Sequence, residues 1–503
     1  MTTEPASLFT TTDYVVVVVY LLIVVVAGSW VGRGQKTVGE YFLAGRSMPW
    51  LVVSLSIVST DLSAISYTGV PAWIWAKDLK YTMGIFLLPL VLLFILVTFI
   101  SIFHRLRVFT TYEYLEHRFH PIARTVTSVL FLGQRGVWLA TAIYAPSLAL
   151  STVSGFSMLR CILTLGALAT LYTVLGGMKA VIWTDFVQFI VLAGGLAFMI
   201  VFLMSSFQWD ASGVWQRAGE LTGSVSGTPH TTMVDWTFDL GAEATVWSIL
   251  FFLFFYNVGT LGTDQVIVQR YLTVDTFRGK AKAVMSGGII SIILVLALAS
   301  LGLLLVVFYD KHPQLAAGIT RPDMLVPHFV AYVLPVGVRG MILAALLAAT
   351  MSSVDSALNS FATVGIMDLY RRWARDLSEA HLLRMGRLFT LVAGVLATLG
   401  AVFVSGMQST VIETVGKLAS TFIGPISGMF FLGVLTRRAN TFGLLVGSFC
   451  GLTTSTLVAW TPISQEVNWM WTAPASSAVT FLVGYVVSLL RPQAGPREQE
   501  ERA

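Results

Sequence analysis

The chain has 503 residues, of which 56% are hydrophobic and only 11% are charged, with a formal net charge of +5. Soluble globular proteins carry about 25% charged residues, so this composition excludes a soluble enzyme or a nucleic-acid-binding protein. Apolar runs of about 18 or more residues, long enough to cross a bilayer, recur along the whole chain. Cys161 and Cys450 both lie in apolar stretches, which argues against a disulfide framework or a thiolate metal site.

The apolar segments predict an all-α polytopic membrane protein with about thirteen transmembrane helices. The expected spans are 14–32, 48–75, 81–103, 125–150, 158–176, 180–206, 244–270, 284–309, 338–369, 386–406, 410–436, 440–460 and 471–490. With the N-terminus outside, most of the 31 basic residues fall in inner loops, as the positive-inside rule requires. We therefore expect an N-out/C-in topology, a single transmembrane domain over 1–503 and a short cytoplasmic tail over 491–503.

The second and seventh spans are interrupted by polar and helix-breaking residues. In the second span, a run of polar residues around Asp61 is followed by Gly69 and Pro71, and in the seventh span Gly259 and Gly262 lie among polar neighbours. Interrupted helices leave backbone groups that must be satisfied inside the protein. A pair of them at equivalent positions of two halves indicates an inverted-repeat transporter with a site near the bilayer midplane. Kinks that serve only helix packing are the alternative.

The ninth span carries a polar stripe. Ser352, Asp355, Ser356 and Asn359 follow the i, i+3, i+4, i+7 spacing of one helix face, with Ser353 at its edge. Hydroxyl groups in membrane helices often bond back to the carbonyl four residues earlier. So many oxygens together with a carboxylate instead suit a hard alkali cation. The stripe contains no His or Cys, so we do not expect a transition metal there.

Two basic residues fall inside spans and away from their ends, where ionisable groups are costly and usually functional. Arg135 in the fourth span has no local partner, so it needs an acid from another helix, a bound anion, or both. Lys417 in the eleventh span lies one turn after Glu413, and these two residues would also suit a helix-face pair. Two cations near the midplane favour a small organic anion as solute, because a guanidinium binds a carboxylate through two N–H groups.

Several motifs, in order from about Tyr41 to Asn440, resemble those of the sodium:solute symporter family. They are YFLAGRSMPW, TYEYLEHRF, IYAPSLAL, LGGMKAVIWTDFVQ, TDQVIVQRYL and MSSVDSALNS. The resemblance implies a leucine-transporter-type fold with two inverted five-helix repeats, over about 48–206 and 244–437, and extra flanking helices. It also implies sodium-coupled secondary active transport across the cell membrane by alternating access, and no enzymatic activity.

The resemblance also implies the residues that bind the coupling ion. Carried over by motif, one sodium site consists of the backbone carbonyls of Ser59, Leu62 and Ala349 and the hydroxyls of Ser352 and Ser353. A second sodium site, present in some members, would use Asp185, Ser352, Asp355 and Ser356. Asp355 stands where a hydroxyl residue is often found, so use of a proton in place of the second sodium stays open.

The motifs do not agree on one substrate branch. TDQVIVQR is similar to the sugar branch, whereas IYAPSLAL and LGGMKAVIWTD are similar to the branch that carries monocarboxylates, vitamins and iodide. We expect a monocarboxylate or another small organic anion, with a sugar or polyol as the alternative. The residues expected to contact the solute are Ser66, Gln134, Arg135, Tyr256, Asn257 and Lys417. A non-transporting membrane sensor and a channel are less favoured. Apart from the bilayer, sodium and the solute, no nucleic-acid or protein partner is expected.

Overall fold

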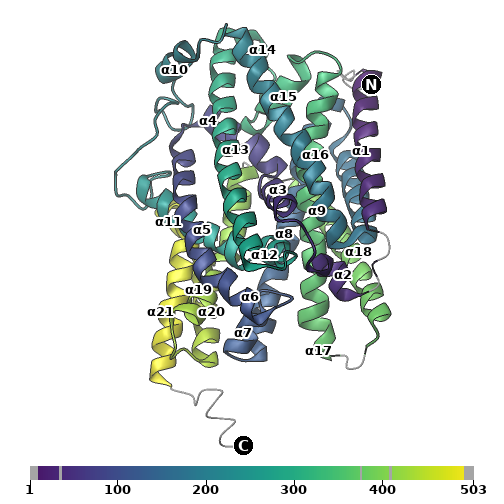
Figure 1. Cartoon of the computed structure of the whole chain (residues 1–503). Coiled ribbons are helices and arrows are strands. Elements are labelled where there is room, and N and C mark those ends of the chain that lie inside the picture. Colours follow the sequence, from purple (N-terminus) through teal and green to yellow (C-terminus); the bar gives the residue numbers. More distant parts are fainter. Residues whose placement is uncertain (1–9, 33–34, 36, 374–376, 407–410, 492–503) are drawn as a thin grey trace, which may run out of the picture.

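The computed structural model describes residues 10–32, 35, 37–373, 377–406 and 411–491, and the regular secondary structure of these ranges is helical. The helices that run through the bundle in Figure 1 are α1 (Thr11–Val31), α3 (Trp50–Asp61), α4 (Ala64–Ala76), η2 (Lys80–Leu87), α5 (Leu88–Ile95), η3 (Leu96–Ile100), α6 (Ser101–Leu106), α8 (Pro121–Ser154), α9 (Met158–Ser206), α11 (Val246–Asn257), η4 (Val258–Thr263), α12 (Gln265–Leu272), α13 (Phe277–Lys311), α16 (Val338–Val364), η6 (Gly365–Tyr370), α18 (Glu379–Val404), α19 (Val411–Leu435), α20 (Thr441–Trp460) and α21 (Thr472–Leu490). Shorter helices connect them: α2 (Val38–Leu43), η1 (Ala44–Arg46), α7 (Glu113–Arg118), α10 (Ala211–Glu220), α14 (Pro313–Ala316), η5 (Pro322–Met324), α15 (Leu325–Tyr332), α17 (Arg371–Trp373), η7 (Pro462–Gln465) and η8 (Trp469–Trp471).

The number of membrane crossings is close to the expected one. Within the described ranges, eleven helical segments are long and apolar enough to cross a bilayer, and the bent pair α3–α4 makes a twelfth. The remaining expected span, 158–176, is present as a shorter apolar helix, Met158–Leu171. It runs into the following span within α9, where the backbone kinks at Gly177 with a φ of 60°. The order of elements is therefore the predicted one, and α9 is helical through the whole of the expected span 158–176.

Both interrupted spans are broken within their polar runs, although Gly69 and Pro71 lie inside α4 and not at the break. Helix α3 ends at Asp61, Leu62 leaves the helical conformation, and α4 starts again after Ser63 with a bend of 51°. The seventh span passes from α11 into the wide turns of η4 and then into an extended Asp264 before α12 begins. Helices α3 and α12 contact each other, so the two breaks lie together inside the bundle.

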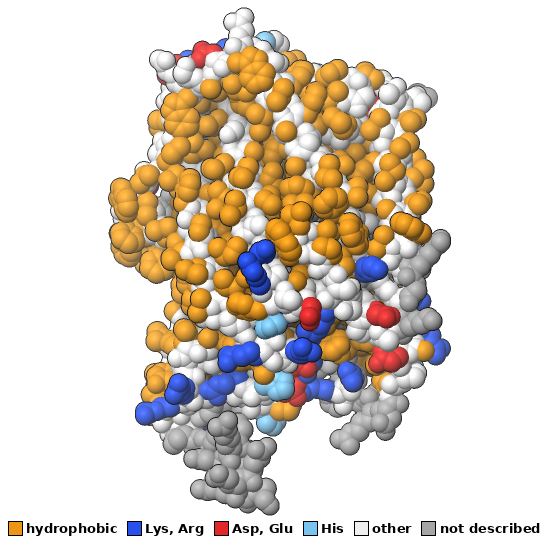
Figure 2. Space-filling model, viewed as in Figure 1, with side chains coloured by type: hydrophobic (Ala, Val, Ile, Leu, Met, Phe, Trp, Pro, Cys, Tyr) orange, Lys and Arg blue, Asp and Glu red, His pale blue; other side chains and the backbone are white. Residues whose placement is uncertain are grey.

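The two sides of the bundle differ in charge. The start of α1 and the end of α21 lie at opposite ends of the molecule in Figure 1, as an odd number of crossings requires. On the face seen in Figure 2, hydrophobic side chains cover the upper and middle part, and most Lys and Arg side chains gather at the lower end, where α21 ends. The basic end is the one that the positive-inside rule assigns to the cytoplasm.

Helix α16 forms the centre of the fold. It packs against α1, α3, α8, α9 and α18, and almost all of its residues from Ile342 to Val364 are buried. A helix that is buried on every side carries its polar residues into the protein interior rather than to lipid or water. The polar stripe predicted from the sequence therefore faces other helices, and α3 with its break is one of them.

Candidate functional site

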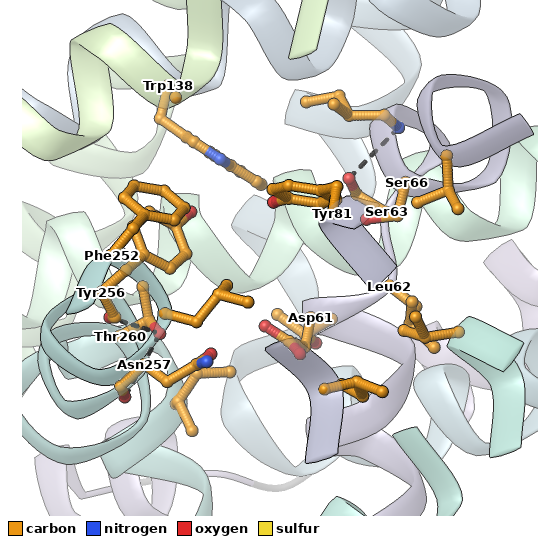
Figure 3. A pocket seen from close by; sticks show the side chains of 18 of the residues that line it. Asp61, Leu62, Ser63, Ser66, Tyr81, Trp138, Phe252, Tyr256, Asn257 and Thr260 are labelled. Atoms are coloured by element: carbon orange, nitrogen blue, oxygen red, sulfur yellow. Dashed lines mark hydrogen bonds between the residues drawn. The ribbon is translucent and has the colours of Figure 1, made fainter. Parts of the chain in front are cut away.

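A cavity of about 210 Å³ lies at the two helix breaks. Its wall combines residues of α3, α4, η2, α8, α11, η4 and α12 (Figure 3). Of the residues expected to contact the solute, the cavity is lined by Ser66, Arg135, Tyr256 and Asn257. Gln134 is buried beside Arg135 on α8, and Lys417 follows the lining residue Gly416 on α19, but neither is part of the cavity wall. The volume is below the 300–1,000 Å³ of pockets for drug-sized ligands, so the cavity suits a small solute.

Asp61 is the acidic residue in the cavity wall. It is the last residue of α3, and its side chain is exposed although packed helices surround it. The exposed surface therefore belongs to the cavity, and Figure 3 shows the carboxylate pointing toward the space bordered by Tyr256 and Asn257. No hydrogen bond or salt bridge joins Asp61 to another residue of the described ranges. Its negative charge is therefore available to a bound solute.

Arg135 has the acidic partner on another helix that its sequence context requires. Its Nη2 group donates a hydrogen bond to Asp264 Oδ2, and both side chains are buried. The other oxygen of Asp264 accepts from the amide of Val266 at 2.8 Å and so caps the start of α12. The Nε–H of Arg135 is buried without a partner in the described structure. Sequence spacing gave no sign of this pair because the two residues lie 129 positions apart.

The predicted first sodium site lies where α16 meets the end of α3. Ser353 Oγ is 3.0 Å from the carbonyl oxygen of Thr60 and 3.1 Å from that of Ala349. The hydroxyls of Ser352 and Thr60 are 3.3 Å apart. Carbonyl groups in the last turn of a helix have no intrahelical partner, so the break in α3 exposes several oxygens toward α16.

The remaining residues predicted for this site lie at the same break. Ser59 is in the last turn of α3, and its hydroxyl is buried without a hydrogen-bond partner in the described structure. Leu62 donates its amide to Val58 but then departs from the helix with a ψ of 77°, which releases its carbonyl. A hydroxyl without a partner, close to backbone carbonyl oxygens at a helix break, is a suitable setting for an alkali cation. Among the residues that the structure describes, no cluster of three His, Cys, Asp or Glu side chains suits a transition metal.

Near the predicted second sodium site lies a positive charge that the sequence did not reveal. Arg270 on α12 is fully buried, and it is the last residue of the expected span 244–270. It donates to Asp185 Oδ2 at 2.9 Å, to Ser56 Oγ at 2.9 Å and to Ser356 Oγ. The carboxylate of Asp355 accepts from Ser356 Oγ at 3.1 Å. The Arg270 guanidinium thus contacts two residues, Asp185 and Ser356, that were predicted to bind a second sodium.

Comparison with known proteins agrees with this architecture. Residues 41–451 match the model of the sodium:solute symporter family. The chain is 33% identical to the rabbit (Oryctolagus cuniculus) sodium-dependent multivitamin transporter, over 94% of this chain and 73% of the relative. It is 29% identical to the human sodium-coupled monocarboxylate transporter 1, over 87% of this chain and 70% of the relative. A solved structure described as the substrate-bound, outward-open state of a sodium-coupled sialic acid symporter superposes with a TM-score of 0.87 and 25% identity, covering 97% of this chain and 99% of the other.

Proposed function

The chain belongs to the sodium:solute symporter family, and on that premise we propose that it couples sodium entry to the uptake of a small organic solute that carries a carboxylate. It is a multi-pass membrane transporter with the leucine-transporter-type fold, not an enzyme, and it is a sodium-coupled solute symporter. The solute class and the ion-binding residues are the parts that we propose.

The observation that carries the proposed solute class is the state of Arg135. One edge of its guanidinium is paired with Asp264, and its Nε–H has no partner in the described structure although the residue lines the cavity. A buried donor without a partner costs about 1–3 kcal/mol, and a carboxylate oxygen would satisfy it with a charge-assisted hydrogen bond. A relative that carries monocarboxylates supports the same class.

We propose that one sodium ion binds at the break of α3, to oxygens of Ser59, Leu62, Ala349, Ser352 and Ser353. The ion would join the last turn of α3 to α16 and so stabilise the conformation in which Asp61 and Ser66 face the solute. Coupling requires only that sodium favour the state that binds the solute. The predicted repeats, 48–206 and 244–437, would then move against each other to open the cavity to the inside. A second sodium at Asp185, Asp355 and Ser356 would compete with the Arg270 guanidinium, so this proposal uses one ion.

Uptake into proteoliposomes tests this proposal. Purified protein is given an inward sodium gradient and a panel of labelled monocarboxylates, sugars and amino acids. We expect at least one carboxylate-bearing solute to accumulate. Arg135→Gln should raise the concentration of this solute for half-maximal uptake by tenfold or more, and Arg135→Lys should raise it less. Arg160→Gln, at an exposed position, is the matched control. Accumulation of sugars or polyols alone would contradict the proposal that the solute carries a carboxylate. It would instead favour recognition of hydroxyl groups through Tyr256 and Asn257.

A further inference from the structure

The cavity does not have the charge that a simple organic anion needs. Asp61 and Arg135 are the charged residues in its described wall, and Asp264 already neutralises Arg135. These three groups together carry one net negative charge. A sodium ion at the adjacent break of α3 would cancel it. A monocarboxylate would then add an unbalanced negative charge near the bilayer midplane, where uncompensated charge is costly.

Two aromatic rings of the cavity wall each contact a positively charged side chain of the protein. The ammonium of Lys77 lies 3.8 Å from the ring centre of Trp73. The guanidinium of Arg135 lies 4.9 Å from the ring centre of Trp138. Both tryptophans line the cavity, and both distances are within the range of about 6 Å at which the face of an aromatic ring attracts a positive charge.

Three more rings surround the cavity next to Asp61. Tyr81, Phe252 and Tyr256 line the cavity, and Phe252 and Tyr256 stack with ring centres 5.1 Å apart. Figure 3 shows Tyr81, Tyr256 and the Asp61 carboxylate around the same space. Aromatic faces arranged beside an unpaired carboxylate form an environment for an ammonium group, whether it is protonated or alkylated.

We infer that the solute is a zwitterion, with its carboxylate at Arg135 and its positively charged nitrogen between Asp61 and the rings of Tyr81, Phe252 and Tyr256. This inference rests on the proposed function and narrows its solute class to amino acids and betaines small enough for the cavity. A zwitterion adds no net charge to the site. It also gives Asp61 and the Arg135 Nε–H a partner each.

Pairs of solutes that differ only in this charge test the inference. In each pair a carbon replaces the nitrogen: L-alanine and isobutyrate, β-alanine and butyrate, glycine betaine and 3,3-dimethylbutyrate. Sodium-driven uptake into proteoliposomes is measured for each. We expect at least one zwitterion to be carried with a half-saturation about tenfold or more below that of its carbon counterpart. Asp61→Asn should remove most of that preference, and Asp239→Asn in an exposed loop should keep it.

A second pair of variants avoids the residues next to the sodium site. Tyr256→Leu removes a ring and should reduce the preference for the zwitterion several-fold, whereas Tyr256→Phe keeps the ring and should retain it. Equal uptake of both members of every pair by the unmodified protein would overturn the inference but leave the proposed function standing. Failure to carry any carboxylate-bearing solute would overturn both. If Tyr256→Leu and Asp61→Asn both kept the preference of the unmodified protein for the zwitterion over its carbon counterpart, the inference would also be overturned.

Discussion

Asp61 and Asp355 are both carboxylates within membrane spans, but their different surroundings suit different roles. Asp61 ends a helix and faces the cavity, whereas Asp355 is buried on α16 and accepts a hydrogen bond from Ser356. The sequence predicts an ion-binding role for Asp355 and places Asp61 only within the interrupted second span. The helix break makes the difference, since it turns one carboxylate toward a solute.

Ser353 provides a direct test of the first sodium site at the scale of one oxygen. Ser353→Ala removes the hydroxyl that lies between the Thr60 and Ala349 carbonyls, so a bound sodium would lose one ligand. We expect the sodium concentration for half-maximal uptake to rise by tenfold or more. Ser300→Ala removes a hydroxyl that bonds only within the lipid-facing side of α13 and should change nothing. Unaltered sodium dependence of uptake in Ser353→Ala would contradict the assignment of Ser353 to the sodium site.

Arg270 and Asp185 form a buried pair whose loss should affect stability. Arg270→Gln leaves Asp185 without its countercharge in a fully buried position, which costs about 3–5 kcal/mol. We expect a marked fall in thermal unfolding temperature in detergent. Adding Asp185→Asn removes the unpaired charge, so the double variant should recover part of the loss. A double variant that is less stable than Arg270→Gln alone would contradict this interpretation of the pair.

The cavity residues were partly predictable from the sequence. Polar residues at the helix breaks, such as Ser66, Tyr256 and Asn257, do line the cavity. Gln134 and Lys417 do not, because neighbouring residues on a helix point about 100° apart, and sequence alone does not say which of two adjacent residues faces inward. The partners of Arg135 and Arg270 were beyond prediction, since they lie 129 and 85 residues away along the chain.

At the scale of elements, the kink in α9 depends on Gly177. This residue has a φ of 60°, and a Cβ there would lie 2.3 Å from Gln35 Oε1 and 2.9 Å from Tyr41 Cδ2. We expect Gly177→Ala to destabilise the protein by about 1–3 kcal/mol. Gly194→Ala, in the same helix with open space around the added methyl group, should be neutral or stabilise by up to about 1 kcal/mol. Equal unfolding temperatures for the two variants would contradict the role of the kink.

Helix α7 at the cytoplasmic end is held by a charged cluster. Glu116 accepts from Arg124 at 2.7 Å and also pairs with Arg372. Arg124 in turn donates to the buried Asp368 through its Nε at 2.8 Å. Burial raises the pKa of Glu116, but its bonds to the two arginines outweigh this and hold the pKa below its usual range. The pairs therefore tie α7 to α8, η6 and α17.

This cluster predicts a pH dependence of stability. A depressed pKa means that Glu116 contributes stability above its unfolded pKa of about 4.3 and loses the contribution as the pH falls through its folded pKa. Glu116→Gln should therefore lower the free energy of unfolding at pH 7 by about 1 kcal/mol, and the difference from the unmodified protein should shrink as the pH falls from 7 through the folded pKa of Glu116. Thermal unfolding across this pH range checks it, and a difference that grows on acidification would contradict the assignment.

At the scale of the whole molecule, the sequence predicts the fold class well because a bilayer allows few solutions. Long apolar spans, their order and both interrupted helices appear as expected. Hydropathy alone does not register that the expected spans 158–176 and 180–206 are joined within α9 by the kink at Gly177. Charge follows the architecture: many basic residues mark one end, and inside the bundle Arg135 and Arg270 pair with Asp264 and Asp185 while Asp61 faces the cavity.

Sodium entry supplies the free energy for solute accumulation in a sodium-coupled symporter. An ion moving through 100 mV supplies about 2.3 kcal/mol, which corresponds to roughly fifty-fold accumulation. The most direct measurement compares uptake into the same proteoliposomes under equal inward gradients of sodium and of potassium. We expect the solute to accumulate above its external concentration with sodium only, and this accumulation to be lost when the sodium gradient is dissipated. Equal accumulation with potassium, or accumulation that survives collapse of the sodium gradient, would contradict it.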